Sequence, residues 1–215
     1  MSQLLQSPIL PQASPTPTDP PQEPTAKGRT LSVIIPAYND LKHLIPCLKS
    51  LVQTAAEAGQ QGRLQILVQD DASPDIDLRE IIGPPVSVER NERNLGFAAN
   101  CNTGAKRAQG DILLFLNQDT KARPGWFDPL MAMFDNPKVG IIGPKLVFSD
   151  NGKGDSIQSC GGWYDGGRGP FHRYLGYAAD YWPVNFAERV SWTTGAAFAI
   201  RREFFGAIAG FDTIY

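Results

Sequence analysis

The chain has 215 residues, of which 42% are apolar and 20% are charged, a composition ordinary for a globular protein. Its formal net charge is -2, so no basic excess points to a nucleic-acid partner. No apolar run is long enough to cross a bilayer, and we expect no secretory signal at the N-terminus. The three cysteines have neither metal-binding nor disulfide spacing. We therefore expect a cytoplasmic protein, with a peripheral position at the inner face of the membrane left open.

The first 29 residues differ in composition from the rest of the chain. They hold 7 of the 18 prolines, separated mainly by Gln, Ser and Thr. Proline rings exclude regular helix and central strand, and few large apolar side chains are present to offset the entropy of ordering. We predict a disordered leader over 1–29 and one domain over 30–215. The PxxP spacing within 17–24 leaves an SH3-type ligand as an alternative, although no arginine lies close enough to strengthen it.

The first half of this domain alternates strands with helices. Asn39 or Asp40 can cap a helix whose apolar residues recur at helical spacing. Pro46 lies inside that pattern, so we expect the helix to start late or to kink there. Short apolar runs predict strands over 31–35, 64–68 and 86–89.

The second half continues this alternation around one unusual segment. We predict strands over 112–116, 139–148 and 190–200 and helices over 97–108, over 126–134 and from Arg201. The segment 150–190 is rich in glycine and aromatic residues, which predicts a long loop layer rather than a core element. Strands alternating with helices predict an α/β fold, with a mostly parallel sheet flanked by helices on both faces.

Polar residues directly follow three of the predicted strands. Ligands of open parallel sheets bind outside the carboxyl ends of the strands, so these residues predict a nucleotide and metal site. The first turn contains no glycine, which speaks against a Rossmann dinucleotide site, and no Walker A loop is present. The residues in question are Pro36, Ala37, Tyr38 and Asn39, then Asp70 and Asp71, then Asn117, Gln118 and Asp119.

Five segments of the chain carry a resemblance to a known family. They are SVIIPAYN (32–39), VQDDASPD (68–75), NLGFAAN (94–100), LNQDT (116–120), and TGA (194–196) continuing to GFD (210–212). In this order and spacing they resemble the family 2 glycosyltransferases of GT-A fold, a Rossmann-like architecture, and especially their rhamnosyltransferase-like members. The resemblance covers nearly the whole predicted domain.

The resemblance implies how a nucleotide sugar is held. The turn 36–39 lies against the base, with Pro36, Ala37 and Tyr38 cradling it. Asp70 accepts a hydrogen bond from the imide N–H of the base, which favours a UDP- or dTDP-type donor over a purine nucleotide. We also assign Asn39, Asn94, Gly96, Asn100, Asn117 and Gln118 to the nucleotide-binding set.

The resemblance also implies a divalent cation. Asp119 matches the last aspartate of the family's DxD motif and would hold Mg²⁺ or Mn²⁺ together with the substrate phosphates. The cation would neutralise charge on the leaving nucleoside diphosphate. Asn117 replaces the first aspartate of the motif, so we expect weaker metal affinity and a contact of Asn117 with the ribose.

Plainer interpretations stay open for several of these residues. Asp70 and Asp71 can form a helix cap and turn. Asn94 and Gly96 can mark only a turn and a helix start, and Asn100 can be a solvated helix residue.

The resemblance implies an inverting glycosyltransferase. It would move a hexose or deoxyhexose from a nucleoside diphosphate sugar to a saccharide or lipid-linked acceptor. The general base of the family is expected shortly after the segment 210–212, beyond the last residue of this sequence, so we assign no catalytic residue. We expect a truncated chain. One alternative is that a partner chain completes the acceptor half. Another is that the chain is a non-catalytic nucleotide-sugar-binding or interaction module.

Overall fold

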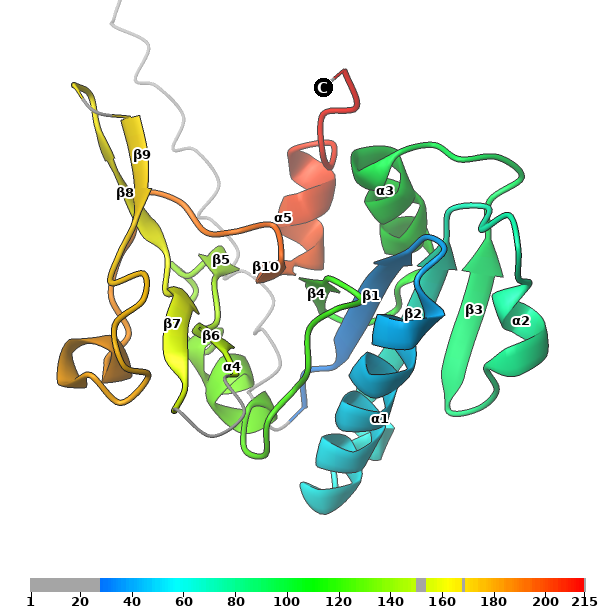
Figure 1. Cartoon of the computed structure of the whole chain (residues 1–215), viewed down its shortest axis with the longest axis horizontal. Coiled ribbons are helices and arrows are strands. Elements are labelled where there is room, and N and C mark those ends of the chain that lie inside the picture. Colours follow the sequence, from blue (N-terminus) through cyan, green and yellow to red (C-terminus); the bar gives the residue numbers. More distant parts are fainter. Residues whose placement is uncertain (1–27, 150–153, 168, 215) are drawn as a thin grey trace, which may run out of the picture.

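The computed structural model describes residues 28–149, 154–167 and 169–214, and the predicted leader lies almost entirely outside them. The described chain is built on a six-stranded sheet (Figure 1) with the order β3-β2-β1-β4-β10-β5. The first four strands in this order are parallel, and β10 runs antiparallel to both of its neighbours. The strands are β1 (Leu31–Ala37), β2 (Leu64–Asp70), β3 (Val86–Arg90), β4 (Ile112–Leu116), β5 (Ile141–Ile142) and β10 (Ala197–Arg201). The mostly parallel α/β sheet predicted from the sequence is thereby confirmed.

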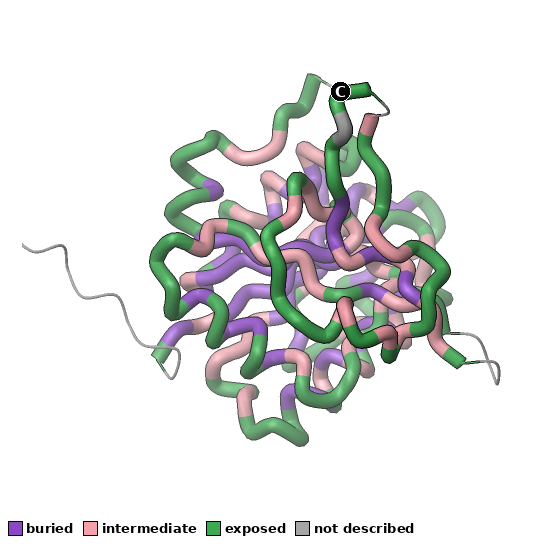
Figure 2. Tube along the Cα trace, turned by 90° about the vertical axis from the view of Figure 1, so that its left-hand side faces the viewer, coloured by how far each residue is buried: buried purple, intermediate pink, exposed green. Residues whose placement is uncertain are grey.

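Helices cover both faces of this sheet because its strands are apolar on both sides. Val33 and Ile35 belong to one buried cluster with residues of α1 and α4, whereas Ile34 belongs to another with residues of α3 and α5. Successive strand residues point to opposite faces, so one strand supplies both clusters. The buried residues accordingly concentrate along the central strands (Figure 2). The helices are α1 (Leu41–Glu57), α2 (Leu78–Ile81), α3 (Phe97–Arg107), α4 (Phe127–Met133) and α5 (Arg202–Ala207), with 3-10 turns η1 (Gln61–Arg63) and η2 (Trp182–Asn185).

The first helix is longer than its proline suggested. Asp40 is the N-cap, and its carboxylate accepts from the backbone N–H of His43. The helix begins directly at Leu41 and includes Pro46, so the prediction of a late start is wrong. Pro46 is the sixth residue of the helix and loses a single backbone hydrogen bond there. Burial of Leu44, Leu48 and other residues of the same face compensates this loss.

Three predictions for the C-terminal half need correction. The strand expected over 139–148 is two strands, β5 and β6 (Leu146–Phe148), which belong to different sheets. Pro144 lies between them and cannot donate to a ladder, while Gly143 lies so close to Thr193 that a Cβ would come within 1.9 Å of its hydroxyl. The strand expected over 190–200 begins only at Ala197.

The third correction concerns the expected loop layer, which contains regular structure. It forms β7 (Ser156–Ser159), which pairs with β6, and a hairpin of β8 (Gly162–Asp165) and β9 (Gly169–His172). We call the described part of 146–192 the side lobe; it lies beside the main sheet (Figure 1). Three tyrosines, Tyr174, Tyr177 and Tyr181, pack there with ring centroids 5.1–5.6 Å apart. Within the described residues, no helix is long and apolar enough to cross a membrane.

Candidate functional site

A cavity of about 340 Å³ opens where β1 and β4 end and α3 begins. This volume lies within the range of small-molecule sites. Its lining contains nine of the eleven residues that the sequence analysis assigns to nucleotide or cation binding. The nine are Pro36, Ala37, Tyr38, Asn94, Gly96, Asn100, Asn117, Gln118 and Asp119. Asp71, which was named with Asp70 among the polar residues at the strand ends, also lines the cavity, as do Asp40 and Phe97, which were not predicted for the site.

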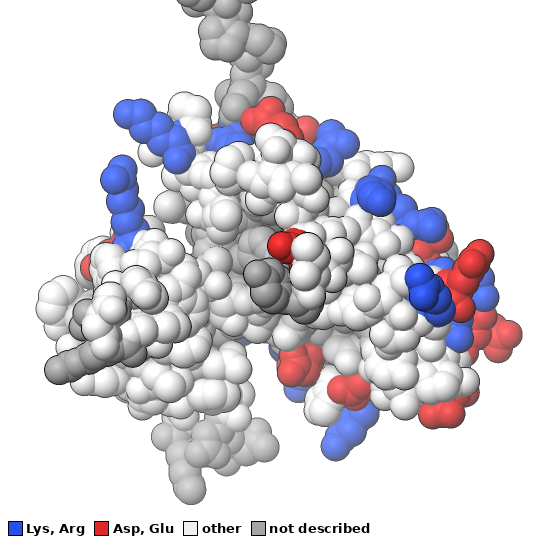
Figure 3. All heavy atoms as spheres, turned by 90° about the horizontal axis from the view of Figure 1, so that it is seen from above, with Lys and Arg blue, Asp and Glu red and all other residues white. Residues whose placement is uncertain are grey.

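The view onto this edge of the sheet is given in Figure 3. The parallel strands β1 and β3 point upward in Figure 1, toward the face that Figure 3 presents. Charged side chains gather around the body of the sheet, while the side lobe presents mostly uncharged atoms. The surface is hollowed between the two parts.

The ends of β1 and β4 are joined by a pair of hydrogen bonds. Gln118 Oε1 accepts from the backbone N–H of Tyr38 at 3.2 Å, and Gln118 Nε2 donates to the carbonyl of Tyr38 at 3.4 Å. The Tyr38 backbone is therefore fixed, while its side chain is 47% exposed. An exposed ring on a fixed backbone is suited to packing against a planar ligand.

Asn39, predicted for the site, does not line the cavity. It has a φ of 44°, in the left-handed region that asparagine tolerates better than most residues. Its backbone N–H donates to Ser73 Oγ at 2.9 Å. Asn39 thus closes the turn between β1 and α1.

Asp70, predicted to read the base, is also absent from the cavity lining. Its side chain is fully buried and forms an ion pair with Arg90 at 2.7 Å. Its other carboxylate oxygen accepts from the N–H and the hydroxyl of Ser73 at 3.0 and 2.6 Å. Asp70 therefore holds the turn after β2, as the interpretation of this residue as a cap and turn expects.

Asp71 faces the cavity instead. Its Oδ1 accepts from Asn91 Nδ2 and from the backbone N–H of Leu95, both at 2.8 Å. Its Oδ2 accepts from the backbone N–H of Gly96 at 2.9 Å. Three N–H donors surround this carboxylate, and no cationic side chain of the described residues pairs with it.

The start of α3 brings the other predicted residues into the cavity. Gly96 is the N-cap residue with a φ of +83°, a conformation that favours glycine. Asn94 Oδ1 accepts from the Gly96 N–H at 3.1 Å. Asn100 is only 2% exposed and donates to the carbonyl of Gln69 at 2.8 Å, so it is not a solvated helix residue.

Asp119 is the carboxylate best placed to bind a cation. It is exposed at the cavity and forms no hydrogen bond or ion pair with any residue that the structure describes. The adjacent Asn117 is fixed by its backbone, whose N–H donates to the carbonyl of Ala196 at 2.8 Å. Burial, and secondarily the charge of Asp119, raises the pKa of the nearby Cys47 thiol to about 12, so Cys47 is not a thiolate ligand.

These residues fit a divalent cation that takes most of its ligands from a substrate. Among the described residues, no group of three or more His, Cys, Asp or Glu side chains could hold a metal ion. Mg²⁺ and similar hard cations often bind through one or two carboxylates together with substrate phosphates and water. Asp40 also lines the cavity, but its carboxylate is engaged by His43, whose hydrogen bond lowers the Asp40 pKa. Asp119 is thus the one described carboxylate of the cavity lining that makes no bond to protein.

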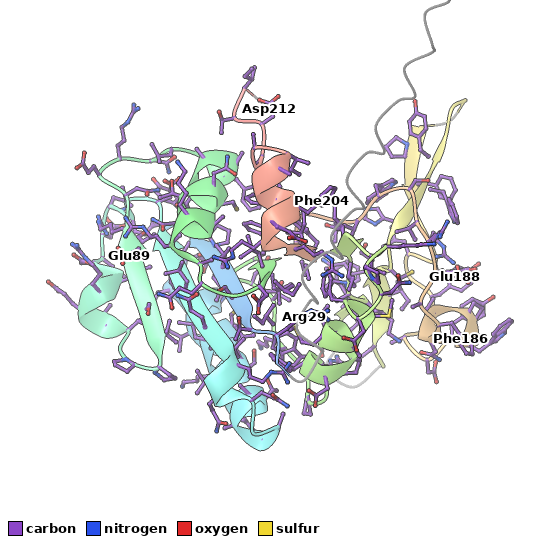
Figure 4. The ribbon with its side chains drawn as sticks, turned by 180° about the vertical axis from the view of Figure 1, so that it is seen from behind. Arg29, Glu89, Phe186, Glu188, Phe204 and Asp212 are labelled. Atoms are coloured by element: carbon purple, nitrogen blue, oxygen red, sulfur yellow. The ribbon has the colours of Figure 1, made fainter. Side chains whose placement is uncertain are left out.

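None of the last described residues is placed in a way that identifies it as a general base. Figure 4 places Phe204 on α5 and Asp212 beyond the end of that helix. Asp212 is exposed, and its carboxylate accepts from the N–H of Ile214 at 2.9 Å. No catalytic residue is assigned.

The fold and the position of the cavity define a GT-A domain. The fold is shared with GalNAc-T7 in complex with UDP, GalNAc and Mn²⁺, with a TM-score of 0.64, 21% identity, and coverage of 86% of this chain and 37% of that chain. It is also shared with a mannosyltransferase from Pyrobaculum calidifontis in complex with GDP-Man and Mn²⁺, with a TM-score of 0.58, 20% identity, and coverage of 93% and 52%.

The family follows from the sequence match. The chain belongs to glycosyl transferase family 2, whose family model matches residues 32–205. It is 26% identical to the pre-mycofactocin glycosyltransferase of Mycobacterium tuberculosis over 90% of this chain and 37% of the relative. It is 32% identical to an uncharacterized glycosyltransferase of Haemophilus influenzae over 52% of this chain and 37% of the relative. The chain spans little more than a third of the length of these relatives.

Sequence reasoning placed both Asp70 and Asp71 at the strand end and assigned the base contact to Asp70, whereas the structure puts Asp71 at the cavity. The signal was present, because the two aspartates are adjacent, and side chains of successive extended residues point in opposite directions. Which of the two faces the cavity depends on where Arg90 and the start of α3 lie. Phe97 was assigned only to the start of a predicted helix, and Asp40 only to a cap.

Proposed function

We propose that this chain binds a nucleoside diphosphate sugar in the cavity and serves in transfer of its sugar. The observation that supports this most is the convergence of three strand and helix ends on one cavity, with a carboxylate at Asp119 that no described residue pairs with. Membership of glycosyl transferase family 2 supports the class of reaction. The donor would be of UDP or dTDP type.

The base would lie between Tyr38 and Asp71. The exposed Tyr38 side chain offers a face for stacking. Asp71 offers a carboxylate that can only accept, so it favours a base with a ring N–H, such as uracil or thymine, over adenine. Asp71 takes the role here that the sequence suggested for Asp70.

The diphosphate would lie toward Asp119. We propose that the Asp119 carboxylate, with Asn117 beside it, holds Mg²⁺ or Mn²⁺ against the phosphates. When bound, such a cation stabilises negative charge on the leaving diphosphate. Two structural neighbours were determined with Mn²⁺ and a nucleotide or nucleotide sugar, which supports this choice of ion.

The transfer would be an inverting single displacement. An acceptor hydroxyl oxygen forms a bond to the anomeric carbon of a hexose or deoxyhexose while the bond from that carbon to the diphosphate oxygen breaks. The hydroxyl proton passes to a general base that is not assigned here. The acceptor would be a saccharide or a lipid-linked saccharide, and a partner chain could complete its site.

Calorimetric titration of the 215-residue chain with UDP, dTDP, GDP and ADP, with and without Mn²⁺, tests this proposal. We expect Mn²⁺-dependent binding of a pyrimidine diphosphate. Folded protein that binds none of the four nucleotides would contradict the proposal. Binding without sugar transfer would favour a non-catalytic nucleotide-sugar-binding module.

Asp119→Ala tests the cation site directly. Because Asp119 supplies the free carboxylate, we expect the variant to lose the Mn²⁺-dependent part of UDP affinity, measured by the same titration. Asp75→Ala is the matched control, since Asp75 is exposed and does not line the cavity. Unchanged Mn²⁺ dependence in Asp119→Ala would remove this residue from the site.

A further inference from the structure

Asn91 is buried behind the cavity and does not line it. It follows β3 directly, and its backbone N–H donates to the carbonyl of Asp70 at 2.8 Å. Its side-chain Nδ2 donates to two acceptors, Asp71 Oδ1 and Asn100 Oδ1, both at 2.8 Å. Its Oδ1 accepts from Gln69 Nε2 at 3.0 Å. All hydrogen-bonding groups of the Asn91 side chain are therefore used inside the protein.

The charge of Asp71 sets the direction of this network. An ionised carboxylate only accepts hydrogen bonds, so Asn91 must turn its Nδ2 toward Asp71. The Asn91 Oδ1 then points to Gln69, which must donate a hydrogen bond to it from Nε2. Gln69 Oε1 is consequently buried with no hydrogen-bond partner among the described residues. The network thus leaves one of its own acceptors unpaired while it satisfies the carboxylate of Asp71.

The network also determines which part of the carboxylate remains available. Oδ1 already accepts two hydrogen bonds, from Asn91 and from the backbone of Leu95. Oδ2 accepts one, from the backbone of Gly96. A carboxylate oxygen accepts about two hydrogen bonds, so one acceptor position remains, on Oδ2. Because Asp71 lines the cavity, that position is the one a ligand can use.

The geometry points to Asn91 as a positioning residue for base recognition, which holds the Asp71 carboxylate so that one acceptor position faces the ligand. This inference rests on the proposed function, because it takes the ligand to be a nucleotide whose base has a ring N–H. Without the Asn91 donor, Oδ1 regains a free acceptor position and the carboxylate can rotate. The cavity would still bind phosphate at Asp119, but it would discriminate less between bases.

The test compares UDP with 3-methyl-UDP, which carries a methyl group in place of the imide N–H. Calorimetry in the presence of Mn²⁺ gives the dissociation constants of both nucleotides and of inorganic diphosphate. For the wild-type chain we expect UDP to bind about tenfold or more tightly than 3-methyl-UDP, as for loss of a hydrogen bond to a charged group. The steric effect of the methyl group is common to all variants, so changes in this ratio report on Asp71.

Asn91→Leu removes both N–H donors of the Asn91 side chain and replaces it with a side chain of similar size. We expect the ratio to fall at least threefold, with the affinity for inorganic diphosphate within twofold of wild type. Asn91→Ser is the second variant, for use if the leucine variant does not fold. Gln69→Leu is the matched control: it removes a buried amide from the same network but leaves all three donors to Asp71, so we expect the wild-type ratio.

Three results would overturn the inference. The first is an unchanged ratio in both Asn91 variants. The second is an equal loss of affinity for UDP, 3-methyl-UDP and inorganic diphosphate, which would make Asn91 an architectural residue only. The third is a wild-type chain that binds none of these ligands, in which case the proposed function fails and the inference fails with it.

Discussion

At the scale of single residues, the pair Asp70 and Asp71 shows how neighbours in sequence acquire different tasks. Asp70 is fully buried; its carboxylate forms an ion pair with Arg90 and accepts a hydrogen bond from the Ser73 hydroxyl. Asp71 meets only N–H donors and keeps one acceptor position toward the cavity. The same chemical group is structural in the first environment and available for a ligand in the second.

We expect Asp71→Asn and Asp70→Asn to separate these roles. Asp71→Asn should weaken UDP binding about tenfold, because the amide offers the imide N–H a weaker, uncharged acceptor. Asp70→Asn should instead lower the free energy of unfolding by about 2 kcal/mol, because Arg90 loses its charged partner. Calorimetric titration and denaturant unfolding measure the two effects. The assignment is wrong if Asp70→Asn weakens UDP more than Asp71→Asn does.

At the scale of elements, α3 positions the site because it lies unusually close to the sheet. Gly104 is the reason: a Cβ at this position would come within 2.6 Å of Ile34 Cγ2 and 3.4 Å of Gln69 Cβ. Glycine therefore allows the helix to approach β1 and β2, and the N-terminal end of α3 reaches the cavity. Asn100, one turn earlier, can then donate to the backbone of β2.

Gly104→Ala and Gly206→Ala form a matched pair of helical substitutions. Gly104→Ala should cost about 1–3 kcal/mol of unfolding free energy, because the methyl group overpacks the helix–sheet contact. Gly206 lies in α5 and has no atom within 4 Å of an added Cβ, so Gly206→Ala should stabilise the chain by about 0.5–1 kcal/mol. Denaturant unfolding measures both. Similar values for the two variants would contradict the close packing of α3.

The N-cap residue of α1, Asp40, makes a pH-dependent contribution to the stability of the fold. The hydrogen bond from His43 lowers the pKa of Asp40 below its ordinary value. A carboxylate whose pKa is lower in the folded state than in the unfolded state stabilises the fold at pH values above its unfolded-state pKa. This stabilisation is lost as the pH falls through the folded-state pKa.

We therefore expect Asp40→Ala to destabilise the chain by about 1 kcal/mol at neutral pH, with the difference shrinking below about pH 4. Asp40→Asn keeps an N-cap acceptor and should therefore destabilise the chain less than Asp40→Ala does. Thermal unfolding across this pH range is the measurement. A difference between Asp40→Ala and wild type that grows toward acid pH would refute the assignment.

At the scale of the whole molecule, the folded body includes residues just before the predicted boundary at 30. Arg29 is 4% exposed and forms an ion pair with Asp135 at 2.7 Å. Its carbonyl accepts from Arg63 Nε at 3.0 Å. The chain before β1 is thus tied to the turn after α4, through Asp135, and to η1, through Arg63. The side lobe contrasts with this body, since Phe186 and Trp182 there are 67% and 70% exposed (Figure 4 marks Phe186).

Removal of residues 1–27 should therefore change the melting temperature by less than about 2 °C, because their composition gives them little apolar surface to bury. Arg29→Ala in the full chain should lower the free energy of unfolding by about 1–3 kcal/mol, because it removes a mostly buried charged hydrogen bond. Differential scanning calorimetry compares the two. A larger loss from the truncation than from the substitution would show that the leader is part of the folded body.

The sequence by itself determined the parallel α/β core and most of the cavity. The runs 31–35, 64–68 and 112–116 are apolar on both faces, so each could only be a central strand, and the polar residues that follow them had to meet at one edge. Tyr38, Asn117 and Asp119 are found there for this reason.

Only the tertiary structure decided which side chains turn toward the cavity. Asp70 and Asp71 differ by one residue in an extended chain, and their exchange of roles depends on Arg90 and on the N-terminal end of α3, contacts made 20 to 25 residues away. The same holds for the division of 139–148 between two sheets, where Gly143 lies close against Thr193 from a distant part of the chain. Local pattern sets the elements, because it governs burial of each face. Long-range packing sets the orientation of individual groups, because their partners come from elsewhere in the chain.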